Sequence, residues 1–131
     1  MNVYLTGDTH GRFERIACFS RNRRTTREDV LIILCDAGVN YCINHRDEKL
    51  KRYIGTMPIT LLCIHGNHEA RPTAALRYEP VERFGGTVMA QCEYPNLLFA
   101  LDGEVYELGG RIPHCTASLR RCQSKILRAR P

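Results

Sequence analysis

Three short segments of the sequence combine carboxylate, imidazole and amide side chains with glycine. They are Gly7-Asp8-Thr9-His10-Gly11, Asp36-Ala37-Gly38 and Gly66-Asn67-His68-Glu69. Oxygen and imidazole donors without thiolates suit Mn, Fe, Zn or Ni, and glycine lets a backbone bend closely around an ion. We therefore expect a metal site with ligands from all three segments. The candidate ligands are Asp8, His10, Asp36 and Asn67.

The residues next to these ligands suggest what such a site would do. Two divalent cations about 3.5–4 Å apart can activate water and stabilise the attacking and leaving oxygens of a displacement at phosphorus. A histidine beside the metals can protonate a leaving alkoxide, and a carboxylate can orient that imidazole. His68 and Glu69 are the candidates for these two roles. The expected chemistry is hydrolysis of a phosphoester.

Each segment follows an apolar run that predicts a strand, at 2–6, 30–34 and 59–64. The residues between them have helical spacing, which predicts helices at about 12–22 and 44–54. Asn44 is a candidate N-terminal cap for the second helix. Alternating strands and helices of this kind form a parallel sheet, whose carboxyl ends share one edge. The three polar segments should therefore meet at that edge.

The pattern loosens after Arg71-Pro72. Short strands are predicted at 87–90, 96–100 and 105–108, with a turn at Gly85-Gly86 and a hairpin turn at Asp102-Gly103. We thus expect an α/β fold with a mainly parallel sheet followed by hairpin strands.

In order and spacing, the three segments resemble the first three motifs of calcineurin-like metallophosphoesterases. The resemblance covers about residues 1–110. It implies the N-terminal half of an αββα sandwich, a dinuclear metal centre and hydrolysis of phosphomonoesters or phosphodiesters. Asp8 and His10 would bind the first metal, and Asp36 would bridge the pair. Asn67 would bind the second metal, and His68 would donate a proton or stabilise the transition state.

The sequence departs from the pattern of this family in two places. Its second motif usually reads Gly-Asp-x-x-Asp, whereas Cys35 replaces the glycine here and Val39 the later acid. The family also completes its site with a Gly-His segment and a later Gly-His-x-His. After Glu69 the sequence has only His114, and its neighbours match neither motif.

The last 21 residues carry all of the excess positive charge. Residues 1–110 hold 13 Lys/Arg and 14 Asp/Glu, a net charge of −1, whereas residues 111–131 hold six Lys/Arg and no acid. We therefore expect a partial phosphoesterase domain at 1–110 and a basic tail at 111–131 that is foreign to it. One hypothesis is truncation or a frameshift near Arg111. The rival is a genuine basic tail that binds RNA or an acidic surface.

Two other classes of function stay open alongside the enzyme. The first is a non-catalytic scaffold remnant or a protein that binds through its basic tail, which the missing histidines favour. The second is a nucleic-acid-binding module, supported by the tail and by the basic cluster 21–27, but without interleaved aromatic residues for stacking.

The remaining expectations concern the cell and the partners. No apolar run is long enough to span a bilayer and no signal peptide is visible, so we expect a cytoplasmic protein without membrane contact. The seven cysteines include no Cys-x-x-Cys pair and are expected to be reduced, mostly buried thiols. The expected partner is a phosphoester substrate. An incomplete sheet would also expose apolar surface and favour self-association.

Overall fold

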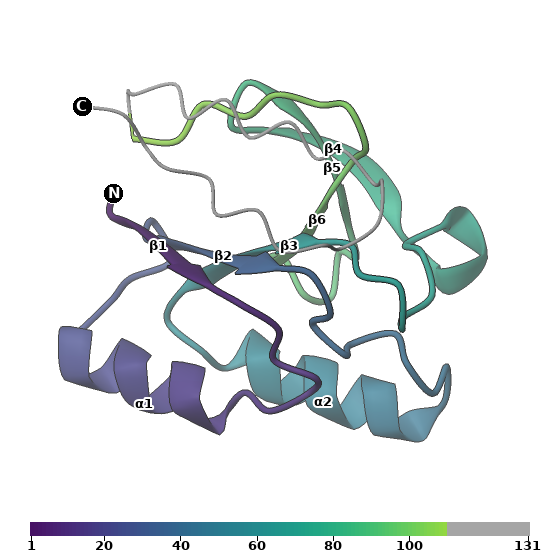
Figure 1. Cartoon of the computed structure of the whole chain (residues 1–131), viewed down its shortest axis with the longest axis horizontal. Coiled ribbons are helices and arrows are strands. Elements are labelled where there is room, and N and C mark those ends of the chain that lie inside the picture. The colour runs from purple at the N-terminus through teal and green to yellow at the C-terminus, as the bar shows by residue number, and fades with distance from the viewer. Residues whose placement is uncertain (110–131) are drawn as a thin grey trace.

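The computed structural model describes residues 1–109 of the 131-residue chain. Strands and helices alternate through its first half, which confirms the predicted unit. Their bounds are β1 (Val3–Thr6), α1 (Glu14–Arg23), β2 (Val30–Leu34), α2 (His45–Gly55) and β3 (Thr60–Ile64). The three strands are parallel and lie in the order β1-β2-β3. Right-handed crossovers that advance in one direction place their helices on one face, and α1 and α2 do lie together below the sheet (Figure 1).

The second half adds an antiparallel extension to this parallel core. It contains the short 3₁₀ helix η1 (Ala74–Leu76) and the strands β4 (Glu79–Arg83), β5 (Gly86–Ala90) and β6 (Leu97–Ala100). β6 pairs parallel with β3, and β5 and β4 follow antiparallel, so the sheet order is β1-β2-β3-β6-β5-β4. This mixed α/β architecture, a mainly parallel sheet with an antiparallel extension, confirms the predicted fold class.

The second half differs from the sequence-based predictions in three places. The sequence did not predict β4, whose residues are all exposed and include Pro80, as suits an edge strand. The predicted strand at 105–108 forms no ladder. Instead, Tyr106 is buried and its hydroxyl group donates to the carbonyl of Thr87, while Glu107 N donates to Phe84 O. Asp102-Gly103 does form a turn, but not a two-stranded hairpin.

Apolar side chains cover both faces of the sheet. On the helical face, Phe13 and Ile54 pack with Ile33 and Leu61. On the other face, β5 and the segment around Tyr106 pack against the alternate residues of β2, β3 and β6. The core therefore holds the three strand ends of the first half in a fixed register.

Some apolar side chains remain exposed at the β1 edge. Leu5 is 67% exposed, and Val3 is 36% exposed beside it. Self-association through this edge stays a prediction, and so do the cytoplasmic location and the domain boundary at residue 110. The tail 111–131 lies outside the described residues. Within residues 1–109, no helix has the length and apolar character needed to cross a membrane.

Asn44 caps helix α2 as predicted. Its side-chain oxygen accepts a hydrogen bond from Arg46 N at 2.9 Å. Asn44→Ala should therefore lower the free energy of unfolding by about 1 kcal/mol, whereas Asn44→Asp, which keeps the acceptor, should lose little. Urea denaturation of the two variants checks this, and equal midpoints would show that the cap contributes nothing.

Candidate metal centre

The loops that follow β1 and β2 are joined by backbone hydrogen bonds. The N–H groups of Thr9 and His10 both donate to the carbonyl of Asp36 at 3.0 Å, and Gly11 N donates to Ala37 O at 2.8 Å. The parallel register of β1 and β2 brings these loops to the same edge of the sheet. Residues 26 or 27 positions apart in the sequence are thus fixed beside one another.

This junction brings together three of the four predicted ligands. One ligand atom from each of Asp8, His10 and Asp36 lies within 4.8 Å of the others. His10 Nε2 is 3.4 Å from Asp8 Oδ2. Asp8 and His10 are exposed, whereas Asp36 is only 3% exposed, so the group has an open side and an anchored side. The fourth predicted ligand, Asn67, is exposed on the loop after β3.

Asp36 also holds His68, the predicted proton donor. Asp36 Oδ1 accepts the backbone N–H of His68 at 2.9 Å, and Asp36 Oδ2 accepts from His68 Nδ1 at 2.8 Å. Burial alone would raise the pKa of Asp36, but the hydrogen bonds from His68 outweigh it and leave that pKa below its usual value. The same hydrogen bond raises the pKa of His68, which favours its protonated form.

Glu69 makes different contacts from those expected. Its carboxylate does not meet the His68 imidazole, since Asp36 occupies that position. Instead, Glu69 Oε2 accepts from Gly38 N at 2.7 Å and from Val39 N at 3.3 Å, and Oε1 accepts from Gly66 N at 3.3 Å. Glu69 is buried and fastens the third loop to the second. Its contacts are those of a positioning residue.

Two glycines leave the space that these contacts need. A Cβ atom on Gly38 would lie 2.7 Å from the carbonyl carbon of His10. A Cβ atom on Gly66 would lie 2.6 Å from Asp36 Cγ. The tight packing of the three loops, which fixes Asp36, therefore depends on the missing side chains at both positions.

Cys35, which stands in place of the family's glycine, has a left-handed backbone with φ of 84°. It is half-buried, not fully buried as expected for the cysteines of apolar runs. A left-handed conformation costs most residues about 1–2 kcal/mol because Cβ approaches a carbonyl oxygen, and glycine avoids this. The cysteine is therefore a strained substitute at the position before the buried Asp36.

Cys35→Gly should relieve that strain and raise the free energy of unfolding by about 1 kcal/mol. Cys35→Ala is the matched control, because it removes the thiol but keeps Cβ and its strain. Thermal and urea denaturation measure both. If the alanine variant gains as much stability as the glycine variant, the thiol and not the backbone is responsible.

His65 is buried beneath the site and separate from the ligand group. Its Nδ1 has no hydrogen-bond partner within the described residues, and burial, followed by the charge of Arg71, lowers its pKa. Among residues 1–109, the group of ligand atoms within mutual reach does not include His65. The structure thus gives His65 no contact with an ion held by Asp8, His10 and Asp36.

A hollow of about 460 Å³ opens beside the ligand group. His10, Asp36 and His68 line it on the metal side. Tyr41, Arg46 and Leu50 line it from the segment after β2 and from α2. The sequence analysis did not identify these last three residues. The position of Arg46 in the sequence is unusual, because a cation in the first turn of a helix interacts unfavourably with the helix dipole.

Comparison with protein families identifies the family of the chain. The family model described as calcineurin-like phosphoesterase matches residues 1–125. The chain belongs to this family. No curated protein and no solved structure gave a significant match.

Calcineurin-like phosphoesterases typically depend on two metals, and three residues of this chain are placed so that they could hold one such ion. The carboxylates of Asp8 and Asp36 and the imidazole of His10 are within common reach of one ion. They are hard or borderline donors of the kind that divalent transition metals accept. His114, the one histidine after Glu69, lies outside the described residues.

Proposed function

We propose that this chain is a metal-dependent phosphoester hydrolase. The observation that supports it most is the meeting of Asp8, His10 and Asp36, with His68 hydrogen-bonded to Asp36. Family membership supports a phosphoester substrate. The proposal adds two divalent ions, which Asp8, His10, Asp36 and Asn67 would hold.

The metal ions and the residues His68, Asp36 and Glu69 would have separate roles in hydrolysis. Metal ions bound here would supply Lewis acidity and an activated water for displacement at phosphorus. His68 would hold a proton for the departing oxygen, since its raised pKa keeps the imidazole charged to higher pH. Asp36 would orient that imidazole through Nδ1, and Glu69 would keep the loops together.

Hydrolysis of 4-nitrophenyl phosphate and bis(4-nitrophenyl) phosphate tests the proposal. Turnover is expected in Mn²⁺ and should disappear with EDTA. The ratio of the two rates shows whether monoesters or diesters are preferred. Absence of metal-dependent turnover with both compounds, and with a phosphopeptide and a nucleotide, would contradict the proposal.

His68→Ala should lower the rate about 10²–10⁴-fold, the usual contribution of a positioned proton donor. His45→Ala is the matched control, because His45 is exposed at the start of α2 and does not belong to the ligand group. Metal content should be measured in both variants. An equal loss of rate in the two would show that His68 has no special role.

A non-catalytic metal-binding scaffold is the second candidate. It is favoured by one observation: the sequence lacks the Gly-His and Gly-His-x-His motifs that complete the coordination in relatives of the family. It predicts that the chain binds metal through Asp8 and Asp36 but turns over none of the four test compounds.

A further inference from the structure

The side of the hollow away from the metal ligands has its own chemical character. Tyr41 presents an aromatic ring that is 67% exposed, and Leu50 adds a half-buried aliphatic side chain. Arg46 adds a permanent positive charge. We infer that this side is a subsite for the organic part of the substrate, and that it selects a planar ring bearing a second negative charge. The inference rests on the proposed function for the phosphoester but not on turnover.

Arg46 is the arginine among the residues that line the hollow. Like most arginines of the described residues it forms no salt bridge, so its guanidinium is available to a ligand in the hollow. It stands in the first turn of α2, where the helix dipole disfavours a cation. Arginine binds carboxylate and phosphate groups through paired N–H donors. A second anionic group on the substrate would supply the partner that Arg46 lacks.

Tyr41 and Leu50 favour a flat, apolar group next to that anion. An exposed aromatic ring buries area when a second ring stacks on it, and such pairs contribute beyond simple burial. Ligand sites commonly combine apolar walls with a few placed polar groups. Here the polar groups are Arg46 at one side and the metal ligands at the other, so the ring would lie between two anions.

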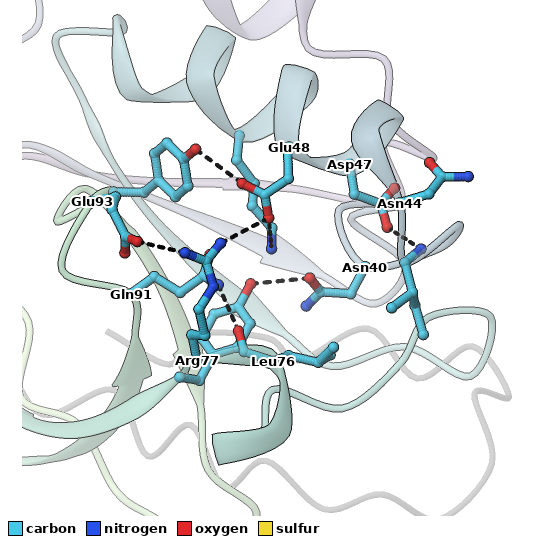
Figure 2. Close-up of polar contacts among 12 residues, drawn as sticks. Asn40, Asn44, Asp47, Glu48, Leu76, Arg77, Gln91 and Glu93 are labelled. Carbon is cyan, nitrogen blue, oxygen red and sulfur yellow. Dashed lines mark hydrogen bonds and ion pairs between the residues drawn. The ribbon is translucent and has the colours of Figure 1, made fainter.

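The loop that carries Tyr41 has an energetically unfavourable backbone conformation. Ile43 has φ of 52°, a left-handed conformation that is rare for a β-branched residue. The buried carboxylate of Asp47, labelled in Figure 2, compensates for this cost. It accepts hydrogen bonds from Ile43 N at 2.6 Å and from Cys42 N at 3.0 Å. Strained backbone that the surroundings hold in place is concentrated at functional sites. The loop is thus preorganised and does not need to fold around a ligand.

The first turn of α2 is anchored on its other side as well. Glu48 accepts from the hydroxyl of Tyr94 at 3.2 Å and pairs with Arg77 at 3.4 Å, and Arg77 pairs in turn with Glu93 (Figure 2). Lys51, almost fully buried, lies 3.6 Å from Glu48. These contacts tie α2 to the second half of the fold and so fix the position of Arg46 relative to the metal ligands.

Binding of a nested series of compounds to the full chain tests the inference by calorimetry, in Mn²⁺ and in EDTA. Inorganic phosphate has neither feature, phenyl phosphate has the ring, and 4-carboxyphenyl phosphate has the ring and the second charge. Affinity should rise at each step. ADP extends the series: tighter binding than 4-carboxyphenyl phosphate assigns nucleotides as the source of this chemistry, and weaker binding assigns simple aryl phosphates.

Two variants and a control separate the contribution of the aromatic ring of Tyr41 from that of the charge of Arg46. Tyr41→Ala should weaken phenyl phosphate and 4-carboxyphenyl phosphate about tenfold and leave inorganic phosphate unchanged. Arg46→Ala should weaken only the compound with the second charge, by about tenfold. Arg52→Ala, which removes an exposed arginine of the same helix outside the hollow, should change nothing. Circular dichroism confirms that the variants fold.

The outcomes distinguish this inference from the proposed function. If all compounds bind alike, or if Tyr41→Ala and Arg46→Ala bind them as the wild type does, the subsite does not exist. If the series binds as expected but neither nitrophenyl ester, the phosphopeptide nor the nucleotide is hydrolysed, the subsite stands and the hydrolase proposal fails.

Discussion

Asp36→Asn should reduce metal-dependent hydrolysis by at least as much as the about 10²–10⁴-fold loss expected for His68→Ala, because it changes a predicted metal ligand and the partner of His68 at once. Even the outer partners of metal ligands typically contribute 10–100-fold, and Asp36 is both the buried ligand of the group and the partner of His68. Asparagine keeps the shape but removes the charge and presents an amide. Rates and bound Mn²⁺ should be measured on the same protein preparations.

The same variant has a readout that does not depend on turnover. Without the carboxylate, the pKa of His68 should fall toward its usual value, and NMR titration of the metal-free protein would detect this. The stability contributed by a raised histidine pKa is complete below the unfolded-state value and disappears as pH rises through the folded-state value. That dependence should be present in the wild type and absent in Asp36→Asn.

Asp102→Asn is the matched control, because Asp102 is an exposed carboxylate paired with Arg71 and lies outside the ligand group. This variant should hydrolyse the substrate and bind Mn²⁺ as the wild type does. Its His68 should keep the raised pKa of the wild type. Wild-type rates in Asp36→Asn, or equal losses in both variants, would contradict the assigned role of Asp36.

Gly66→Ala should disturb the site without removing any polar group. The added methyl would be 2.6 Å from Asp36 Cγ and also 2.6 Å from Asp36 N, so the backbone or the carboxylate must move. Overpacking of this kind costs about 1–3 kcal/mol. We expect that loss in urea denaturation, together with at least a tenfold weaker affinity for Mn²⁺, because the displaced carboxylate no longer faces Asp8 and His10.

Gly7→Ala is the control for this second prediction. Gly7 flanks Asp8 in the first segment, but a Cβ atom there would have nothing within 4 Å. It should bind Mn²⁺ as the wild type does. If the two alanine variants bind Mn²⁺ equally well, the close approach of the third loop to Asp36 is not required.

Sequence patterns predicted those parts of the fold that depend on local signals. The apolar runs at 30–34 and 59–64 are buried strands because both faces of the sheet are covered there, and Asn44 caps α2 through a contact two residues away. The ends of these strands bring the polar segments together because parallel strands share an edge. In contrast, β4 is charged, contains Pro80 and is exposed, so no apolar periodicity marks it.

Sequence patterns did not predict the contacts of the site that join residues far apart in the sequence. Glu69 was expected to orient its neighbour His68, but its carboxylate binds Gly38 N, 31 residues away, and Asp36 takes the imidazole. No sequence motif indicates that Tyr41 or Arg46 lies at the site. Their relation to the metal ligands depends on how α2 packs, which involves Glu48 and Arg77 from distant segments.

The number of Mn²⁺ ions bound per chain tests the central claim most directly. It should be measured by mass spectrometry of the full chain after loading and gel filtration, beside Asp8→Asn. We predict two ions in the wild type and a loss in Asp8→Asn, because Asp8 belongs to the ligand group that Asp36 anchors. A wild type that retains one Mn²⁺ ion or none, or an Asp8→Asn variant that retains as much as the wild type, would contradict the account.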